Sequence, residues 1–420
     1  MCINVKPGHI KGKVKIPASK SYTQRSMVAC LLSEGNSVIH NAGNSEDEIY
    51  IRKAIESLGA KISQHTNSFT INGGLKFQQK EVSTGESGLG IRLLVPVAAL
   101  LNEAITFKGK ASVLKRPLSQ MEEFLNELGA TCKTNKGYMP VTIKGPLKGG
   151  NVTIDGSLSS QFLTGLLFAL PIAENNSSIR VKNLKSKSYI DMTLEVLQKH
   201  GISIKHDNYE IFSIIGRQVY KPAEYFIEGD WSNAAFFFVA GAVRGNVEIQ
   251  GLNPFSLQGD KKIIEILKYC GANIDFEYHT YHIEKCNRLR AFTYDATDTP
   301  DLVPPLAVLA ANCEGISRIK GAERLIHKES NRAKALLDEL SNIGVKIKLE
   351  DEDIILIKGG TITGGLFDSH NDHRIAMAGA ILGLNAQKPV RITNHKAVNK
   401  SFPAFFDVLG ELNVDIDYSE

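Results

Sequence analysis

One local pattern occurs six times along the 420 residues of this chain, at nearly constant spacing. Each time, a stretch with helical patterning ends in Gly or Asn and continues into a short β-like stretch. The residues that end these helices are Gly59, Gly129, Gly201, Gly271, Gly344 and Asn413, at steps of 70, 72, 70, 73 and 69 residues. Gly, and next best Asn, suits the left-handed backbone that closes a helix. The chain is therefore predicted to use one supersecondary unit six times, in globular domains rather than a solenoid.

An apolar helix with a polar first turn recurs in phase with this pattern. The six helices are expected to begin near Ser19, Gly88, Ser159, Trp231, Asp301 and Asn371. Their bodies are rich in Ala, Leu and Gly, and a helix that is apolar nearly all round is buried. Their starts carry Lys, Arg, Gln and hydroxyl groups, beside the unpaired N–H groups and partial positive charge of a helix N-terminus. Several such starts that converge on one cleft would bind a polyanion.

Composition narrows the class of protein. Hydrophobic residues make up 43% and charged residues 22%, as in an ordinary globular protein with large cores. The net charge of +4 is mild and no basic block with interleaved aromatics occurs, so nucleic-acid binding is not expected. Six cysteines without paired spacing favour reduced thiols in the cytoplasm over disulfides or zinc. No signal pattern or membrane-length apolar run occurs, so we expect no membrane contact and a cytoplasmic location.

Six units of about 70 residues divide most simply into two groups of three. The boundary candidates are Pro17-Ala18 and Glu228-Gly229-Asp230, where a turn-prone Gly-Asp meets the start of an apolar helix. We expect a discontinuous domain of residues 1–18 and 229–420 and an inserted domain of residues 19–228, with three units each. Short strands combined with two helices per unit place both domains in the α/β class.

The first helix start combines a Lys, hydroxyl groups and an Arg. Ser19 or Ser21 can cap this helix, and Ser21 and Arg25 share a face because they lie four residues apart. Lys20, a hydroxyl and Arg25 would form a cradle for phosphate or carboxylate. The alternative is a solvated capping turn.

Four further segments allow the same two interpretations. Residues 159–164 place small polar groups at the mouth of a buried helix, which capping also explains. Residues 327–332 place two cations one turn apart around Glu329, which is also typical of a solvated helix start. Residues 371–374 bring three ionisable groups against an apolar helix. Asp301 is either the N-cap of its helix or, among cations, a candidate base.

Taken together, these segments resemble the EPSP synthase (3-phosphoshikimate 1-carboxyvinyltransferase) family across the whole chain. The matching motifs, in order, are Lys20-Ser21 with Arg25, Gly88 with Arg92, Arg116-Pro117, 159–163, 186–191, 228–230, 258–260, 328–332, 371–374 and 400–403. Each motif alone is weak, but their common order along the chain is a strong signal. The resemblance implies two domains of three βαβαββ-type units, an inside-out α/β barrel with buried apolar helices, and an active site in the cleft between the domains.

The resemblance also implies two sets of binding residues. The set for shikimate-3-phosphate comprises Lys20, Ser21, Arg25, Ser159, Ser160, Gln161, Ser186, Tyr189, Asp301 and Lys328. The set for phosphoenolpyruvate comprises Lys20, Gly88, Arg116, Gln161, Arg332, Arg374 and Lys400. Both substrates carry a phosphate and a carboxylate, which forked Arg donors suit.

The implied reaction transfers the enolpyruvyl group of phosphoenolpyruvate to the 5-hydroxyl of shikimate-3-phosphate, in the shikimate pathway to aromatic amino acids. The expected catalytic residues are Asp301, with Lys20, at the hydroxyl and Glu329 at the methylene carbon. We expect a monomer that needs neither a metal nor an organic cofactor. The resemblance further implies that glyphosate competes at the phosphoenolpyruvate site.

Some positions depart from the common family pattern, and other functions compete. The departures are Glu86, Leu89, Asn331 and Arg324, and they concern local contacts, chiefly beside the phosphoenolpyruvate pocket. A UDP-N-acetylglucosamine enolpyruvyl transferase normally has Lys-Asn at its start and a Cys before Arg-Pro, whereas this chain has Lys20-Ser21 and no Cys in residues 111–115. A non-catalytic anion-binding repeat protein would have no reason to keep Asp301 and Glu329 among so many cations.

Overall fold

The computed structural model describes residues 2–419 and divides into two compact units. The split unit consists of Met1–Pro17 and Glu228–Glu420, and the inserted unit is Ala18–Ile227. Each unit has its own hydrophobic core, built from residues of that unit. The chain therefore passes between the two units at residues 17–18 and 227–228.

The helices of the inserted unit alternate between fully buried and amphipathic. They are α1 (Lys20–Leu32), α2 (Glu46–Ser57), α3 (Gly88–Ala98), α4 (Ser119–Glu127), α5 (Gln161–Ala169) and α6 (Lys187–Lys199), with the 3-10 turn η1 (Ala111–Lys115). Its strands are β3 (Gly35–His40), β4 (Lys61–Gln64), β5 (Ser68–Gly73), β6 (Glu81–Ser83), β7 (Ala104–Lys108), β8 (Thr131–Asn135), β9 (Tyr138–Lys144), β10 (Asn151–Asp155), β11 (Ser177–Lys182), β12 (Ile204–Asp207), β13 (Ile211–Ile214) and β14 (Glu224–Phe226).

The split unit repeats this alternation. Its helices are α7 (Trp231–Arg244), α8 (Ile263–Cys270), α9 (Val303–Ala311), α10 (Arg332–Asn342), α11 (His373–Gly383) and α12 (Phe405–Glu411), with the 3-10 turns η2 (Gly259–Lys262), η3 (Pro300–Leu302), η4 (Ala322–Leu325) and η5 (His395–Lys400). Its strands are β1 (Cys2–Val5), β2 (Ile10–Lys15), β15 (Gly245–Gln250), β16 (Ile274–Glu277), β17 (Thr280–Glu284), β18 (Thr293–Asp295), β19 (Ile316–Lys320), β20 (Lys346–Glu350), β21 (Ile354–Lys358), β22 (Gly365–Asp368), β23 (Val390–Thr393) and β24 (Ile416–Ser419).

Strand pairing follows one plan. Within residues 2–419 the strands form six four-stranded sheets, three in each unit. In the sheet β6-β7-β9-β8, β6 runs parallel to β7, whereas β9 is antiparallel to both β7 and β8. This is the βαβαββ-type unit that the family resemblance implied. Three sheets take one strand from a distant part of the chain: β14 pairs with β3, β2 pairs with β15, and β1 lies between β23 and β24.

The residues that end the second helix of each repeat have the expected backbone. Their φ angles are 116° at Gly59, 94° at Gly129, 79° at Gly201, 103° at Gly271, 88° at Gly344 and 66° at Asn413. The left-handed closure predicted from Gly and Asn is therefore confirmed at all six positions.

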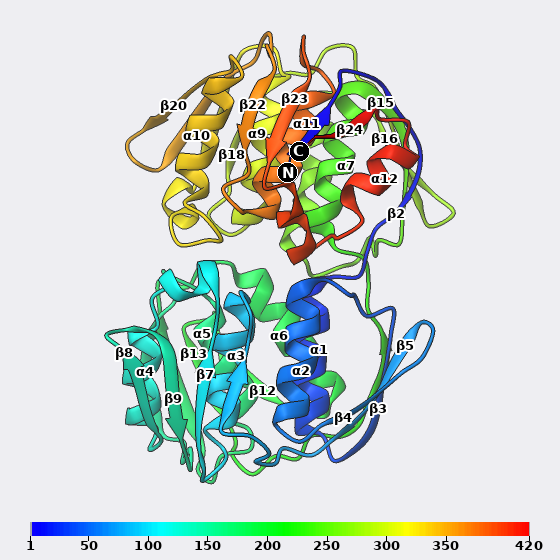
Figure 1. Cartoon of the computed structure of the whole chain (residues 1–420). Helices are drawn as coiled ribbons and strands as arrows, with labels where there is room; N and C mark the ends of the chain where they lie inside the picture. The colour runs from blue at the N-terminus through cyan, green and yellow to red at the C-terminus, as the bar shows by residue number, and fades with distance from the viewer. Residues whose placement is uncertain (1, 420) are drawn as a thin grey trace. The chain divides into compact units, whose positions relative to one another are not determined.

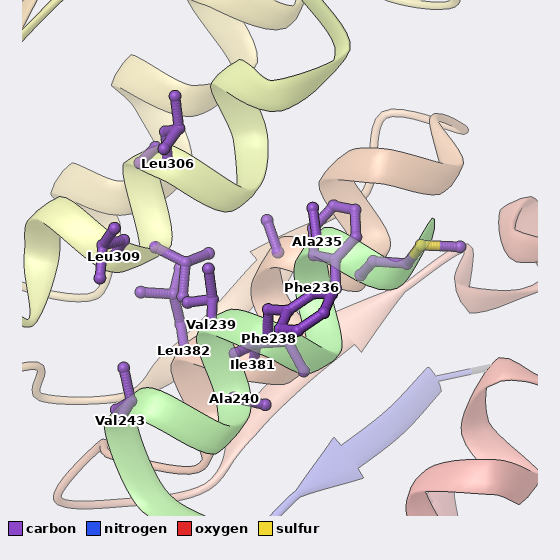
Figure 2. Packing of buried hydrophobic residues seen from close by; sticks show 14 of the residues in the cluster. Ala235, Phe236, Phe238, Val239, Ala240, Val243, Leu306, Leu309, Ile381 and Leu382 are labelled. Atoms are coloured by element: carbon purple, nitrogen blue, oxygen red, sulfur yellow. The ribbon is translucent and has the colours of Figure 1, made fainter. Parts of the chain in front are cut away.

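The apolar helices lie inside each unit, and the sheets lie around them (Figure 1). In the split unit, side chains of α7, α9 and α11 meet in a common core (Figure 2). Phe238 and Val239 of α7, Leu306 of α9 and Ile381 of α11 are each fully buried there. The α/β class with buried apolar helices is therefore confirmed. None of the helices in residues 2–419 combines the length and the hydropathy needed to cross a bilayer.

Candidate active site

Expected site residues gather at helix starts in each unit, so we describe one cluster in the split unit and one in the inserted unit. At the centre of the split-unit cluster is Arg332, the first residue of α10, whose side chain is 1% exposed. Its Nη1 donates to Asp301 at 2.7 Å, its Nη2 to Glu329 at 2.5 Å and its Nε to Asp372 at 2.8 Å. The alternative of a solvated helix start is therefore wrong for Arg332, because three carboxylates surround a buried guanidinium.

Asp301 contacts several cations and does not cap a helix. It lies in the 3-10 turn η3, and α9 begins two residues later at Val303 without a side-chain cap, so the N-cap alternative is wrong. The carboxylate accepts a hydrogen bond from Arg374 Nη2 at 3.2 Å and lies 3.7 Å from Lys328 Nζ. Burial alone would raise the pKa of Asp301, but Arg374, Lys328 and Arg332 together hold that pKa well below its usual range. Asp301 is thus ionised, and it is a weak base while these cations surround it.

Arg374 and Lys400 flank the start of α11. Asp372 caps this helix by accepting the backbone N–H of Arg374 at 3.0 Å. Lys400 Nζ donates to the carbonyl of Asn371 at 2.6 Å. Within residues 2–419, Nε and Nη1 of Arg374 are buried without a hydrogen-bond partner, although Nη2 binds Asp301. Buried donors of this kind are rare and call for a partner, which an anion can supply.

A further carboxyl group adjoins this cluster. Asp260 in η2 is 2% exposed and accepts a hydrogen bond from the Ser232 hydroxyl at the start of α7. Burial, followed by the charge of Asp301, raises the pKa of Asp260 to about 7, against the opposing effect of Arg374. The motif at residues 258–260 carried the family resemblance, but it gave no reason to assign Asp260 to the site.

In the inserted unit, the start of α1 holds Lys20 and Arg25. Ser19 caps the helix by accepting the backbone N–H of Tyr22 at 3.4 Å. Lys20 Nζ donates to Asp47 at 2.8 Å, a partner that the sequence did not indicate. The side chains of Lys20 and Asp47 are 14% and 10% exposed. The ammonium group is therefore largely buried and paired with the Asp47 carboxylate.

Arg25 connects α1 to α6. Its Nε donates to the Thr193 hydroxyl at 2.9 Å, its Nη1 to the Ser21 carbonyl at 2.9 Å and its Nη2 to the Tyr189 carbonyl at 3.2 Å. The guanidinium is 5.8 Å from the centre of the Tyr189 ring. Burial lowers the pKa of Arg25 to about 10. Arg25 and Ser21 do share a helix face, but they meet through the Ser21 carbonyl.

Arg92 binds several of the expected site residues elsewhere in the inserted unit. Its Nη1 donates to the Gly88 carbonyl at 3.0 Å and to Gln161 Oε1 at 3.3 Å, and its Nη2 to the Pro117 carbonyl at 3.1 Å. A Cβ on Gly88 would lie 2.1 Å from Arg116 Nη1, so the Arg116 guanidinium lies directly against this glycine. Arg92 was part of a motif in the sequence but was assigned to neither binding set. Its position four residues after Gly88 could have indicated that the two residues share a helix face.

Serines at two helix starts complete the inserted-unit cluster. Ser159 Oγ accepts the backbone N–H of Gln161 at 3.2 Å, as a local turn would require, and Ser160 is 5% exposed. Ser186 precedes α6 with φ 59° and ψ 51°, a left-handed conformation that non-glycine residues rarely adopt. Such backbone strain concentrates at functional sites.

The positions that depart from the family pattern have identifiable neighbours. Glu86 accepts a hydrogen bond from Ser112 at 3.1 Å and so ties the segment before Gly88 to η1. Asn331 caps α10 by accepting the backbone N–H of Lys334 at 3.1 Å. Burial lowers the pKa of Arg324, and Asp298 and Asp301 oppose that effect. Among residues 2–419, no cluster of three or more His, Cys, Asp or Glu side chains is arranged to hold a metal ion.

Comparisons with known proteins show what the whole chain is similar to. The family model described as EPSP synthase (3-phosphoshikimate 1-carboxyvinyltransferase) matches residues 5–409. The chain is similar to the 3-phosphoshikimate 1-carboxyvinyltransferase of Clostridium novyi, at 40% identity over 417 residues that cover 96% of this chain and 95% of the relative. The enzyme of that name from Clostridium kluyveri is 39% identical, with 99% and 98% covered.

Solved structures show the same likeness. The EPSP synthase of Acinetobacter baumannii superposes with a TM-score of 0.84 at 27% sequence identity, and the match covers 100% of both chains. The enolpyruvyl transferase NikO from Streptomyces tendae has a TM-score of 0.81 at 16% identity, with 100% of this chain and 98% of NikO covered. The second likeness is one of fold alone.

Proposed function

The chain belongs to the EPSP synthase (3-phosphoshikimate 1-carboxyvinyltransferase) family, and from this premise we propose that the split-unit and inserted-unit clusters together form its active site. The enzyme transfers the enolpyruvyl group of phosphoenolpyruvate to the 5-hydroxyl of shikimate-3-phosphate in the shikimate pathway and releases phosphate. Each substrate is a polyanion, and each cluster supplies cations. We propose that the substrates bind in the cleft between the two domains and draw them together.

The observation that carries this proposal is the set of contacts around Asp301. Two arginines and a lysine surround this one carboxylate, and two nitrogen atoms of Arg374 remain without a partner in the described chain. A concentration of cations with unpaired hydrogen-bond donors is suited to binding an anionic ligand. A carboxylate at their centre suits a reaction that must remove a proton.

We assign the binding residues as follows. Shikimate-3-phosphate is bound by Lys20, Ser21, Arg25, Ser159, Ser160, Gln161, Ser186, Tyr189, Asp301 and Lys328. Phosphoenolpyruvate is bound by Lys20, Gly88, Arg116, Gln161, Arg332, Arg374 and Lys400. Arg25 is 1% exposed and bonded to Ser21 and Tyr189, so its main contribution is to hold these two residues in place.

In the proposed mechanism, Asp301 accepts the proton of the 5-hydroxyl while that oxygen attacks C2 of phosphoenolpyruvate, with Lys20 beside it. The cations of the ligand-free cluster keep the pKa of Asp301 low. When substrate phosphate and carboxylate groups bind Arg332, Arg374 and Lys328, they neutralise the charges that stabilise the Asp301 carboxylate. Substrate binding thereby raises the pKa of Asp301 and makes it a stronger base.

Glu329 completes the proton balance. Protonated Glu329 gives its proton to the methylene carbon of phosphoenolpyruvate as the tetrahedral intermediate forms, and takes one back from the resulting methyl group as phosphate leaves C2. The proton that Asp301 took from the hydroxyl goes to the departing phosphate, so both carboxyl groups return to their starting states. Its carboxylate lies 2.5 Å from Arg332 Nη2, so it stands beside the group assigned to the substrate anion. Arg116, Arg332, Arg374 and Lys400 stabilise the substrate carboxylate and the departing phosphate.

The first test is the reaction itself. Purified protein is mixed with phosphoenolpyruvate and shikimate-3-phosphate, and released phosphate is measured. We expect release with shikimate-3-phosphate and none when UDP-N-acetylglucosamine replaces it. Release only with the nucleotide sugar would contradict the assignment of the acceptor.

We further propose that the enzyme acts as a monomer in the cytoplasm. The six cysteines are free thiols, as is usual in a reducing compartment. Light scattering of the purified protein and fractionation of cells test these two statements. A stable dimer whose activity depends on its assembly would contradict the first.

A further inference from the structure

The segment between β22 and α11 has an unusual backbone. His370 and Asn371 have φ angles of 51° and 54°, so two adjacent non-glycine residues are left-handed. Asn and His enter this region more readily than most residues, but two in succession are uncommon. Such a conformation persists where the surrounding structure holds it.

A buried carboxylate contacts this segment at two points. Glu339 of α10 accepts the backbone N–H of Asp368 on Oε2 at 2.8 Å and the His370 Nε2–H on Oε1 at 2.9 Å. The backbone N–H of His370 also donates to Asp368 Oδ1 at 2.9 Å. The Glu339 side chain is only 8% exposed. Glu339 therefore fastens both sides of the turn that leads into the strained pair.

The same helix holds the other end of the segment. Arg332 precedes Glu339 by seven residues, or two helical turns, so both side chains project from one face of α10. Arg332 Nε donates to Asp372 Oδ2 at 2.8 Å, and Ser330 Oγ donates to the same oxygen at 3.1 Å. Two side chains of α10, Glu339 and Arg332, thus bind residues 368–372.

Residues 368–372 in turn contact the three cations assigned to phosphoenolpyruvate, which are Arg332, Arg374 and Lys400. The Asn371 carbonyl accepts from Lys400 Nζ at 2.6 Å, and the Asp372 carboxylate holds both Arg332 and the backbone N–H of Arg374. We propose that Glu339 is a positioning residue for phosphoenolpyruvate binding, because it fixes the backbone from which these contacts are made. This inference rests on the proposed assignment of Arg332, Arg374 and Lys400 to that substrate.

Three variants of the full-length enzyme test the inference by steady-state kinetics. Glu339→Ala removes both contacts, and we expect the KM for phosphoenolpyruvate to rise about 10- to 100-fold, as when groups in a site are displaced by about 1 Å. The KM for shikimate-3-phosphate stays nearly unchanged. Glu339→Gln restores most of the affinity, because its amide oxygen can accept from the Asp368 N–H and its amide nitrogen can donate to a neutral imidazole. Asp338→Asn, an exposed charge removed from the same helix, behaves as wild type.

The split between the two KM values separates positioning from general loss of structure. An equal rise in both constants for Glu339→Ala, or a Gln variant as impaired as the Ala variant, overturns the inference. Arg374→Gln is measured in parallel. A normal KM for phosphoenolpyruvate in Arg374→Gln overturns the assignment of the cation and this inference with it. A raised KM in Arg374→Gln beside a normal Glu339→Ala overturns the inference alone.

Discussion

Asp301 is the residue that we propose as the general base of the site. Asp301→Asn keeps the size of the side chain and removes the group that takes the proton. We expect turnover to fall by about 100-fold or more, the usual scale for a general acid–base group. Binding of shikimate-3-phosphate weakens much less, because most of its assigned partners are elsewhere. Steady-state kinetics measures both, and near-normal turnover in the Asn variant would show that Asp301 is not the base.

Asp260 gives the folded protein a pH dependence of its own. Its pKa is raised from the usual 3.8 to about 7, so the folded protein keeps this proton at pH values where the unfolded chain has lost it. This group therefore lowers stability progressively as the pH rises from about 4 to about 7, and the cost remains above that range. Asp260→Asn removes the titration and can still accept from Ser232.

We expect the melting temperature of Asp260→Asn, relative to wild type, to increase between pH 4 and pH 8. Thermal unfolding of the two proteins across this range measures the difference. Curves that run parallel at all pH values would mean that Asp260 does not hold a proton in the folded state near neutrality.

The sequence located the cations of the proposed site but not their partners. Lys20 and Arg332 stand in motifs at helix starts, where their charge is visible in the local pattern. Asp47, which binds Lys20, lies 27 residues further along and begins no motif of its own. Asp372 was part of a motif but was given no role of its own, because the sequence does not show that Arg332, 40 residues away, packs against it. Partners brought together by tertiary packing leave no local signal.

At the scale of elements, the repeat predicted the features that local sequence determines, namely the helix ends and the buried helices. Gly and Asn mark helix ends because few other residues adopt a left-handed backbone, and the six apolar helices are visible from their composition. The sequence did not predict which strands complete each sheet. The strand β1 pairs with β23 and β24 at the far end of the chain, and a four-residue strand carries too little pattern to specify a partner.

One close contact between elements can be tested by adding a methyl group. Pro96 lacks the N–H that would bond the Arg92 carbonyl within α3, and Gly165 of α5 packs against that carbonyl. A Cβ on Gly165 would lie 2.1 Å from the Arg92 oxygen, which is backbone and cannot turn aside. We expect Gly165→Ala to cost about 1–3 kcal/mol of unfolding free energy, the usual cost of overpacking. It also shifts Gln161 relative to Arg92 and so reduces activity.

Gly410→Ala is the matched control, because a Cβ on this helical glycine of α12 has no atom within 4 Å. Denaturant unfolding of both variants measures the difference. A midpoint for Gly165→Ala equal to that of the control would mean that α3 and α5 separate at little cost.

At the scale of the whole molecule, two units with separate cores are joined by two chain crossings, at residues 17–18 and 227–228. The sequence predicted boundaries at residues 18–19 and 228–229, the second because a turn-prone Gly-Asp precedes an apolar helix there. It could not describe how the units move. Because the proposed site takes cations from both clusters, we expect an anion that binds both to attract the two units toward each other.

Binding of shikimate-3-phosphate should therefore make the molecule more compact. Its assigned partners come from both units: Lys20, Ser159 and Ser186 from one, Asp301 and Lys328 from the other. Small-angle scattering with and without the ligand measures the radius of gyration, which we expect to fall on addition of saturating ligand. Shikimate is the matched control, because it keeps the ring and the carboxylate but lacks the phosphate, and we expect it to compact the molecule less. An unchanged radius with saturating shikimate-3-phosphate would contradict a site shared by the two units, because a ligand held by one unit alone has no means of drawing in the other.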